Sequence, residues 1–517
     1  MTTTSTDTAP AEGGEAPMLH VHCPANGRSV GSVPNTTAAE VQAVAAALRQ
    51  AQPAWEDLGP DGRAIHLRAW RDWFLDNERR LGELVQAETG KTWNDASLEP
   101  MVVLDVINYF AKHAAEFLAP RKVAPHGPAG ATKRLRLAFR PHPLVGLITP
   151  WNGPIGNPIL DVVGALLAGA AVISKPSEFT PLSWAESVRG WREDIGAPPI
   201  LACVTGDGTT GAAVVDEVDM IMFTGSARTG RKIAARAGER LIPCSLELGG
   251  KDAMIVLADA DVDRAVSAAA WGSMLNAGQA CISVERVYVE AAVYDEFVEK
   301  VTAKVTSLRV GMDQPGAFAS EIGAIVTPAQ LDIIDSHVRD AVSKGARVLT
   351  GGRRRDAGLF YEPTVLVDVD HTMDCMRHET FGPTLPIMKV ADEDEAIRLA
   401  NDSPYGLSAS VFTRDSARAD RMAARLEAGA VNINNVLSNF FQLSLPMGGW
   451  KESGLGTRLG GANALLKFCR PQAQVSERLN LPAEPYWYPV SRRKATLQAR
   501  FMRLLGAGDW RRRLGRP

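Results

Sequence analysis

Apolar side chains recur at helical spacing through the first part of the chain. Between Val41 and Leu48, and again between Ile65 and Val85, they return every three or four residues. This period lines one face of a helix with apolar side chains. Proline and glycine interrupt the pattern only at intervals, so residues 38–118 are predicted to form a series of helices.

From residue 144 onward the pattern changes to short β-branched runs separated by helical segments. This alternation is typical of a parallel sheet covered by helices, as in nucleotide-binding folds. The sequence therefore predicts an α/β protein with a second such region from 253 to about 446. The predicted strands are 144–148, 171–174, 201–204, 220–223, 245–248, 253–257, 286–289 and 430–433.

Length, charge and cysteine content limit the class of protein. A chain of 517 residues is long enough for roughly two to four domains. Its 56 Lys and Arg against 59 Asp and Glu give a net charge of −3, which argues against a protein dominated by nucleic-acid binding. The six cysteines include no C-x-x-C pair, so neither a disulfide scaffold nor the usual zinc spacing is predicted.

The sequence predicts neither secretion nor a membrane span. Residues 1–17 are polar and small, lack the basic and apolar regions of a signal peptide, and are predicted to be disordered. The longest apolar stretch, 162–173, is interrupted by glycines and is too short to cross a bilayer. A cytoplasmic protein is expected, with the membrane periphery as an alternative because of its C-terminal tail.

Three residues in separate motifs have the chemistry of a catalytic site. Cys281 follows a turn of small residues at 276–280 and has the chemistry of a nucleophile. Glu247 ends an apolar strand, where a carboxylate can act as a general base, and Asn152 lies in a turn, where its amide can donate to an oxyanion. The structural alternative for Cys281 is a small buried apolar side chain. For Glu247 it is an ion pair with Lys251, and for Asn152 it is an ordinary turn residue.

Two glycine-containing motifs have the chemistry to bind a phosphate. Residues 206–211 spell G-x-G-x-x-G, but the acidic residue expected about 20 positions later is missing, which favours a simple turn. Residues 223–226 instead end a strand just before a helix, whose first N–H groups and dipole attract a pyrophosphate. The alternative there is a helix capped by Ser226 or Thr229.

Seven motifs, in order, resemble those of the aldehyde dehydrogenase superfamily over residues 20 to 475. The spacing between Glu247 and Cys281 also matches that family. Within the superfamily the chain is most similar to the succinate-semialdehyde dehydrogenase-like proteins of actinobacteria. The motifs are Pro150–Asn152, Lys175–Glu178, Phe223–Ser226, Glu247–Lys251, Gly278–Cys281, Glu379–Pro383, and Gly448–Gly449 with Lys451–Gly454.

The resemblance implies an aldehyde dehydrogenase-like α/β fold with a Rossmann-type cofactor domain, an α/β catalytic domain and an oligomerisation arm. The NAD-binding domain would comprise residues 18–125 and 140–246, and the catalytic domain residues 247–467. Oligomerisation elements at 126–139 and 468–485 imply a homodimer or homotetramer.

The resemblance also implies oxidation of an aldehyde to its carboxylic acid by NAD, with NADP as an alternative and no metal ion. Cys281 would form a thiohemiacetal and then a thioester, while Asn152 and the Cys281 backbone N–H hold the oxyanion. Glu247 would activate the water that releases the acid. The residues implied to bind the cofactor are Trp151, Lys175, Glu178, Gly225, Ser226, Glu379 and Phe381.

The segment after the Pro-Trp-Asn motif departs from the family. Gly153, Gly156 and Leu160 stand where large side chains are common, and Leu160 stands where a semialdehyde enzyme can carry a carboxylate-binding Arg. Phe440 and Phe441 are predicted to add an aromatic wall, with core or interface packing as the alternative. These features predict a bulky apolar or aromatic aldehyde as the substrate.

Other activities stay open at this point. Succinate semialdehyde is the alternative substrate. A coenzyme A-acylating dehydrogenase is a further alternative, but that subclass generally lacks the glutamate at the position of Glu247. A non-enzymatic protein on the same fold is disfavoured by the intact set of Cys281, Glu247 and Asn152.

Asp161 and Arg458 match the positions of an ion pair that is thought to relay protons in many members of the family. The usual pair is a Lys and a Glu, so the charges are exchanged here. Because an Arg does not lose its proton near neutral pH, Arg458 is not expected to act as a relay base.

The C-terminal tail, residues 486–517, is predicted to be a separate element. Residues 491–517 hold nine Lys or Arg and one acid. The apolar side chains at 497, 501, 504 and 505 fall on one face of a helix. That face is expected to pack on a neighbouring subunit, and the alternative is that the basic helix lies on an anionic membrane surface.

Overall fold

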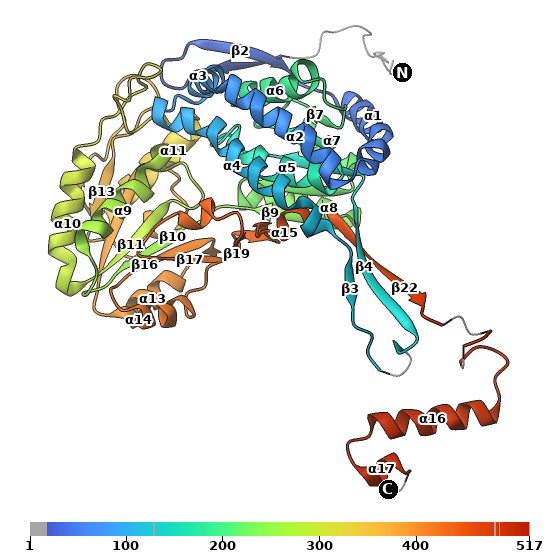
Figure 1. The fold of residues 1–517 in the computed structure, drawn as a ribbon. Helices are drawn as coiled ribbons and strands as arrows, with labels where there is room; N and C mark the ends of the chain where they lie inside the picture. The colour runs from blue at the N-terminus through green and yellow to red at the C-terminus, as the bar shows by residue number, and fades with distance from the viewer. Residues whose placement is uncertain (1–17, 128–129, 480–481, 485, 516–517) are drawn as a thin grey trace, which may run out of the picture. The chain divides into compact units, whose positions relative to one another are not determined.

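The structure, a computed structural model, divides the chain into two compact units (Figure 1). The first unit contains residues up to 119 together with 139–470, and the second contains 120–138 and 471–517. The predicted disorder of residues 1–17 lies outside the described residues. The structure describes residues 18–127, 130–479, 482–484 and 486–515.

The first unit opens with a β-hairpin and a layer of helices, which confirms the helices predicted for residues 38–118. Thr37 starts the first of these helices through a capping box with Glu40, and the third ends at Gly90, whose φ of 69° suits a glycine. The elements are β1 (Met18–His22), β2 (Ser29–Pro34), α1 (Ala38–Asp57), α2 (Gly59–Asp76), α3 (Glu78–Thr89) and α4 (Trp93–Leu118).

A six-stranded sheet follows, in the order β20-β9-β8-β5-β6-β7. Its parallel strands are β5 (Leu144–Ile148), β6 (Ala171–Lys175), β7 (Leu201–Cys203), β8 (Met220–Thr224) and β9 (Cys244–Glu247), with β20 (Gly454–Leu455) antiparallel at the edge. The five strands predicted for this region are confirmed. Between them run α5 (Gly156–Ala168), α6 (Leu182–Arg189), the π-helical turn η2 (Gly190–Asp194), α7 (Gly208–Glu217) and α8 (Ala227–Glu239).

A seven-stranded sheet has the order β12-β13-β14-β11-β10-β16-β17, with only β12 antiparallel to its neighbour. It confirms the strands predicted near 253, 286 and 430. Its strands are β10 (Asp252–Val256), β11 (Val284–Glu290), β12 (Arg347–Thr350), β13 (Thr364–Val367), β14 (Thr384–Val390), β16 (Ser408–Phe412) and β17 (Ala430–Ile433).

Helices lie between the strands of this second sheet, and short segments after β17 lead back to the first sheet. The helices are α9 (Val262–Met274), the 3-10 turn η3 (Leu275–Gly278), α10 (Ala291–Thr306), α11 (Pro328–Ser343), α12 (Asp374–Arg377), α13 (Glu393–Asn401), α14 (Ser416–Ala423), η4 (Ser438–Phe441) and α15 (Asn463–Leu466). The short strands are β15 (Tyr405–Gly406), β18 (Pro446–Met447), β19 (Trp450–Lys451) and β21 (Arg458–Leu459).

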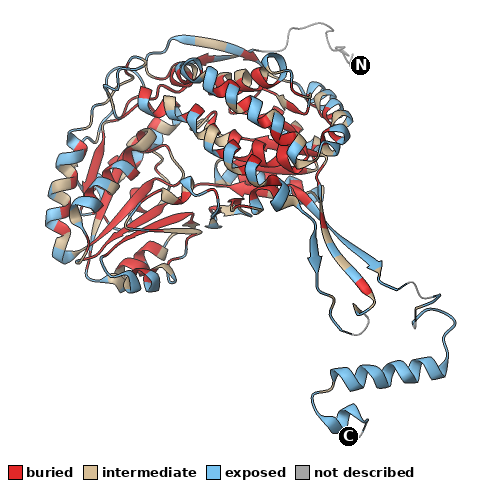
Figure 2. Ribbon diagram, in the orientation of Figure 1, coloured by how far each residue is buried: buried red, intermediate tan, exposed pale blue. Residues whose placement is uncertain are grey.

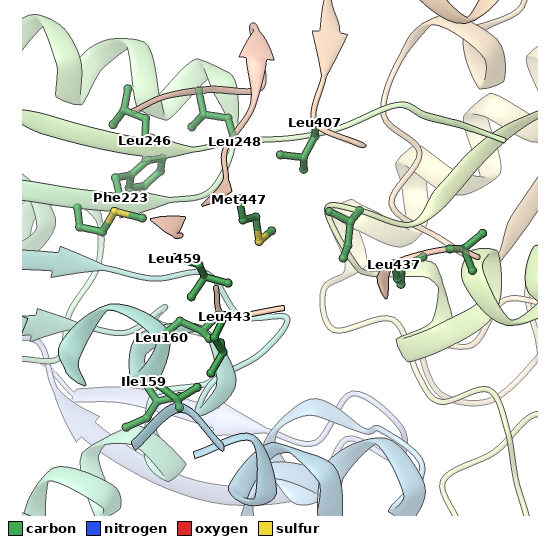
Figure 3. Close-up of a cluster of buried hydrophobic side chains, with 14 of the residues drawn as sticks. Ile159, Leu160, Phe223, Leu246, Leu248, Leu407, Leu437, Leu443, Met447 and Leu459 are labelled. Carbon is green, nitrogen blue, oxygen red and sulfur yellow. The ribbon is translucent and has the colours of Figure 1, made fainter. Parts of the chain in front are cut away.

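The core of the first unit lies along these two sheets (Figure 2). Strands β5, β6, β8 and β10 are buried at every residue, as expected for parallel strands covered on both faces. Figure 3 shows one part of this core, in which Ile159 and Leu160 of α5 are drawn with Leu443 and Leu459 from later segments of the chain. Such packing fixes the strand ends that carry the candidate catalytic residues.

The second unit contains a three-stranded sheet and two helices. The sheet has the order β22-β4-β3, formed by β3 (Arg121–Val123), β4 (Lys133–Pro141) and β22 (Cys469–Glu477). Lys133 forms ion pairs with Glu477, at 2.6 Å, and with Glu484. The helices are α16 (Arg492–Gly506) and α17 (Trp510–Arg513). Across the described residues, no helix is both long and apolar enough to cross a membrane.

Candidate active site

Two cavities of the first unit meet at Cys281. One has a volume of about 270 Å³ and extends along Trp151, Ser226 and Phe381. The other has a volume of about 210 Å³ and is lined largely by apolar side chains. Cys281, Asn152 and Asn157 line both cavities. A thiol at such a junction is accessible to two different molecules at once.

The loop before Cys281 has an unusual backbone. Asn276 and Ala277 have φ values of 54° and 55°, and Gly278 follows at 70°. A Cβ on Gly278 would lie 2.0 Å from the carbonyl oxygen of Gly382, so only glycine fits there. The cysteine is therefore held by a tight turn that is packed against another segment of the chain.

Burial favours the thiol form of Cys281. Burial raises the pKa of Cys281 to about 12, and the negative charge of Glu247 adds to that effect. A thiol is a weak nucleophile compared with its thiolate, so reactivity requires a positive charge close to the sulfur. Its placement between the two cavities permits such a charge to arrive with a ligand.

Glu247 ends β9, is 2% exposed and lines the first cavity. Neither of its carboxyl oxygens has a hydrogen-bond partner among the described residues. Burial raises the pKa of Glu247 to about 7, although the positive charges of Arg458 and Lys467 act to lower it. The expected alternative, an ion pair with Lys251, is wrong, because Lys251 pairs with Glu285 at 2.5 Å.

A buried group of three charges lies behind Glu247. The predicted ion pair between Asp161 and Arg458 is confirmed, with Nη2 of Arg458 2.6 Å from Oδ2 of Asp161. Lys467 is a third member that the sequence did not reveal, with Nζ 2.7 Å from Oδ1 of Asp161. Arg458 also donates to Oγ1 of Thr224, on the strand beside β9. The group brings a net positive charge toward the carboxylate of Glu247.

Several hydrogen bonds hold the Asn152 amide. Asn157 of α5 donates to its Oδ1 at 3.0 Å, which fixes the orientation of the amide. The Asn152 Nδ2 group donates one hydrogen bond to the carbonyl of Gln279 at 2.9 Å. An amide nitrogen carries two hydrogens, so one N–H is left for a ligand in either cavity.

A buried ion pair between Lys91, just before α4, and Glu99 within α4 supports the same turn, and no sequence pattern predicted it. Lys91 pairs with Glu99 and donates to the carbonyl of Asn152 at 2.8 Å. Glu99 in turn accepts hydrogen bonds from the backbone N–H groups of Ile155 at 2.9 Å and Gly156 at 3.1 Å. The pair joins the turn after β5 to the helix that covers it.

The first cavity brings together five of the seven residues that were expected to bind a cofactor: Trp151, Gly225, Ser226, Glu379 and Phe381. The rings of Trp151 and Phe381 meet edge to face with centroids 5.4 Å apart. Lys175 and Glu178 do not line this cavity. They pair with each other at 3.3 Å at the end of β6.

Ser226 caps α8, accepting a hydrogen bond from the Thr229 N–H at 3.3 Å. The cap satisfies one amide, while the preceding amides of the first turn stay directed toward the cavity end of the helix. The prediction of a simple turn for the other glycine motif holds only for its first two residues, because Gly208 to Gly211 begin α7. Asp207 caps α7 and donates its own N–H to Asn35 at 3.1 Å.

The second cavity confirms four of the five predicted pocket residues and corrects the fifth. Gly153, Gly156, Phe440 and Phe441 line it, which favours the predicted aromatic wall over packing in the core. Leu160 does not line it. That residue is 2% exposed and lies inside the buried cluster of Figure 3, because it is one helical turn beyond Gly156 along α5, past the cavity wall.

The remaining apolar lining of this cavity comes from elements that the sequence did not associate with the site. Leu98 of α4 and Trp271 of α9 are 51% and 45% exposed, respectively, so each is a large apolar side chain outside the buried stripe of its helix. Large apolar side chains on the exposed side of a helix are typical of a binding surface, and this pattern is visible in the sequence. The other additional apolar lining residues are Val102, Leu275, Ile282 and Leu437.

Comparison with known proteins assigns the fold to one family. The family model described as "Aldehyde dehydrogenase family" matches residues 11–473. The chain belongs to the aldehyde dehydrogenase family. Its members use NAD or NADP to oxidise aldehydes, so the chain is an NAD(P)-dependent oxidoreductase.

Three similar proteins illustrate the range of this dehydrogenase family. The 4,4'-diapolycopene aldehyde oxidase of Methylomonas sp is 41% identical over 471 residues, 90% of this chain and 87% of that protein. A relative from Mycobacterium ulcerans (strain Agy99), named for succinate semialdehyde and NADP(+), is 41% identical over 461 residues, 88% of this chain and 87% of its own length. The crystal structure of the Mycobacterium tuberculosis aldehyde dehydrogenase complexed with NAD+ has a TM-score of 0.83 at 33% identity and covers 90% of this chain and 95% of its own.

The first cavity of this dehydrogenase has the chemistry that a nicotinamide dinucleotide requires. The N-terminus of α8 offers amide donors to a pyrophosphate, and Trp151 and Phe381 offer apolar faces to a ring. Glu379 accepts a hydrogen bond from the Gly250 N–H at 3.1 Å, and a Cβ on Gly249 would lie 2.3 Å from its carboxylate. The two glycines therefore hold a carboxylate that is available to ribose hydroxyl groups.

Proposed function

We propose that this dehydrogenase oxidises a bulky, mainly apolar or aromatic aldehyde to its carboxylic acid through a thioester on Cys281. The observation that carries the proposal is the placement of Cys281 between two cavities, with a buried and unpaired Glu247 on one of them. A nucleophile needs the aldehyde on one side and the hydride acceptor on the other, and a base must reach the thioester afterwards.

In the first half-reaction the Cys281 thiol loses its proton to solvent, and the resulting thiolate bonds to the aldehyde carbon. The remaining N–H of Asn152 donates to the oxyanion of the resulting thiohemiacetal, in an orientation fixed by Asn157. When bound in the first cavity, NAD or NADP supplies a positive charge near the thiol and accepts the hydride. Cys281 then carries the acyl group as a thioester.

In the second half-reaction Glu247 takes a proton from water, and the hydroxide adds to the thioester carbon. The carbon–sulfur bond breaks, the carboxylic acid leaves and Cys281 is again a thiolate. A general base works best when its pKa lies near the working pH, and burial places the pKa of Glu247 at about 7. Arg458 keeps its proton, so its role here is to stabilise the ionised Glu247.

The substrate class follows from the second cavity. Its walls are mostly apolar, and buried apolar area supplies roughly 25 cal/mol per Å² of binding free energy. Lys91 is the single cationic side chain among the residues that line this described cavity, and Glu99 already neutralises it. The relative named for a diapolycopene aldehyde supports this class.

Succinate semialdehyde is the second candidate, because it is named in the mycobacterial relatives. Its free carboxylate would enter a cavity that contains Asp95 and Glu99 without an unpaired cation among the lining residues that the structure describes. A carboxylate in such surroundings loses hydration without gaining an ion pair. The cavity therefore favours the apolar class.

The enzyme is expected to show a higher kcat/KM for benzaldehyde-type and long-chain aldehydes than for succinic semialdehyde. Reduction of NAD, followed over a panel of aromatic, aliphatic and ω-carboxy aldehydes, measures this order. The free acid should form without coenzyme A. A higher kcat/KM for succinic semialdehyde would contradict the substrate class but leave the oxidation mechanism standing.

A substitution at Gly156 tests whether the second cavity holds the bulky part of the aldehyde. A Cβ there meets only Oε2 of Glu99 at 3.7 Å, so Gly156→Val fills the cavity without disturbing the turn. Overfilling a well-packed space costs about 1–3 kcal/mol, so kcat/KM for bulky aldehydes should fall by roughly fivefold or more. The value for acetaldehyde should change little, and Gly238→Ala, where a Cβ meets nothing within 4 Å, serves as the control.

NAD is expected to be preferred over NADP. Glu178 is proposed to face the adenine ribose, where a carboxylate accepts ribose hydroxyl groups and repels a 2′-phosphate. The Lys175 Nζ lies 3.3 Å from Oε2 of Glu178 and partly neutralises the carboxylate, which weakens its repulsion of the 2′-phosphate. A preference for NAD of roughly five- to tenfold in kcat/KM is therefore expected. Glu178→Gln should reduce the preference, and Glu193→Gln is the control. Equal kcat/KM for both cofactors in the unmodified enzyme would contradict the proposal that Glu178 selects NAD over NADP.

A further inference from the structure

The C-terminal tail differs in charge from the rest of the chain. The chain as a whole has a net charge of −3, whereas residues 491–517 hold nine Lys or Arg and a single acid. Among the described residues of the tail, Asp509 is engaged with Arg512 at 3.3 Å. The tail is therefore a strongly cationic segment attached to an otherwise acidic protein.

Helix α16 in this tail separates apolar from basic side chains. Leu497, Phe501, Leu504 and Leu505 follow one another at the spacing of a single helix face, and they are 49–71% exposed. Every described residue of α16 is exposed, as the continuous pale blue of this helix in Figure 2 shows. The helix thus presents an apolar face that stays about half exposed or more within its own unit.

Arginine residues surround the apolar face rather than lying far from it. Leu497, Phe501 and Leu504 line a hollow together with Leu514 from the segment after α17. The same hollow is lined by three arginines and a lysine: Lys494, Arg500, Arg503 and Arg513. Any surface that covers the leucines must also accept several positive charges at their edge.

Aromatic side chains flank the helix at both ends. Tyr486, Trp487 and Tyr488 precede it and are 54–88% exposed. Trp510 follows it, 61% exposed, with the Arg511 guanidinium 5.6 Å from its ring centroid. Tyr and Trp side chains are enriched at the boundary between lipid headgroups and acyl chains, where an apolar ring and a polar group are both satisfied.

These features distinguish a lipid surface from a second copy of the chain. Arginine and aromatic side chains also occur at protein interfaces, but each arginine buried there needs its own acidic partner on the facing subunit. An anionic bilayer supplies many phosphates at the level of the arginines and acyl chains at the level of the leucines. A helix of 15 residues is also too short to span the bilayer, so it would lie in the surface.

We propose that residues 486–515 form a peripheral anchor that binds anionic lipid bilayers, with the apolar face of α16 inserted among the acyl chains. Membrane binding by this anchor does not depend on which aldehyde the enzyme oxidises. Its benefit to catalysis rests on the proposed function, because apolar aldehydes partition into bilayers and an enzyme on the lipid surface meets them there.

The test is cosedimentation of the full-length protein with vesicles of equal parts phosphatidylcholine and phosphatidylglycerol, compared with pure phosphatidylcholine vesicles. We expect binding to the anionic vesicles that weakens with added salt, and little binding to the neutral ones. Replacing Arg493, Arg500 and Arg503 by glutamine should weaken the partition coefficient by roughly 100-fold. Leu497→Ser combined with Phe501→Ser should weaken it at any salt concentration.

A matched triple variant of the first unit, with Arg79, Arg347 and Arg398 changed to glutamine, removes the same charge from exposed sites and should bind like the unmodified protein. Equal loss in both triple variants, or equal binding to both vesicle types, would overturn the proposal. A tail variant that changes the oligomer size by light scattering without changing vesicle binding would also overturn it, in favour of subunit packing. Turnover of a water-soluble aldehyde, measured in parallel, reports separately on the proposed function.

Discussion

The Glu247→Gln enzyme is expected to transfer one hydride per active site rapidly and then to stall. Glutamine keeps the size of the side chain but takes no proton from water, so the thioester on Cys281 is not hydrolysed. Loss of a general base lowers the steady-state rate by roughly 10²- to 10⁴-fold. Rapid mixing with NAD and an aldehyde should therefore show a burst of NADH close to the enzyme concentration, followed by a very slow phase.

The pH dependence of turnover checks the same assignment. Glu247 acts as a base only when it is ionised, and its pKa is raised to about 7 by burial. If deacylation limits the rate, turnover should rise with pH through about 7 in the unmodified enzyme and lose that rise in Glu247→Gln. Glu239→Gln, at the end of α8, is the control and should keep both rate and profile. A wild-type steady-state rate in Glu247→Gln at neutral pH would falsify the assignment.

Cys281→Ser is expected to abolish turnover and the burst together. A serine hydroxyl in this buried site is not ionised near neutral pH, so the covalent bond to the aldehyde does not form. Removing the nucleophile of an enzyme typically lowers kcat by a factor on the order of 10⁴ to 10⁶. Binding of NAD, followed by quenching of tryptophan fluorescence, should stay the same because the cavity keeps its shape.

Cys244→Ser is the matched control for the nucleophile. Cys244 is also half-buried, begins β9 and lines neither of the two cavities that meet at Cys281. Its substitution should leave kcat within about twofold, since a change away from the site has a small effect. Comparable loss in both variants would mean that the cysteine substitutions act through folding rather than through chemistry.

Much of the fold was predictable because parallel strands buried on both faces are apolar over their whole length. The runs at 144–148 and 220–223 have no other interpretation once the helices between them are recognised. The three catalytic candidates were predictable for a different reason. Each lies at the end of a strand or in a tight turn, where Gly278 and the glycines after Glu247 leave a clear local signature.

The supporting residues were not predictable, because they meet their partners across long stretches of sequence. Lys467 contacts Asp161 from a helix near the end of the first unit, and no local pattern links the two. Lys91 and Glu99 are eight residues apart, which is not the spacing of a helix-surface ion pair, so no local pattern predicts that they pair beneath the turn at Asn152. Burial, which sets the pKa of Glu247, is likewise a property of the whole fold.

Leu160 shows the limit of reasoning from aligned positions. A small or apolar residue at a pocket position is expected to open the pocket, but residues one turn apart on a helix share a face and differ in position along its axis. Gly156, at the start of α5, lines the cavity, whereas Leu160, one turn farther along the helix, packs into the buried core. The predicted space therefore comes from the two glycines.

The most direct test of the central claim is the intact mass of the Glu247→Gln enzyme after mixing with NAD and a bulky apolar aldehyde. The account predicts a mass increase of one acyl group per chain, located on the peptide that contains Cys281 and removed by hydroxylamine. The increase should be absent without NAD and absent when Cys281 is also changed to serine. A full burst of NADH with no covalent adduct, or an adduct on another residue, would contradict the account.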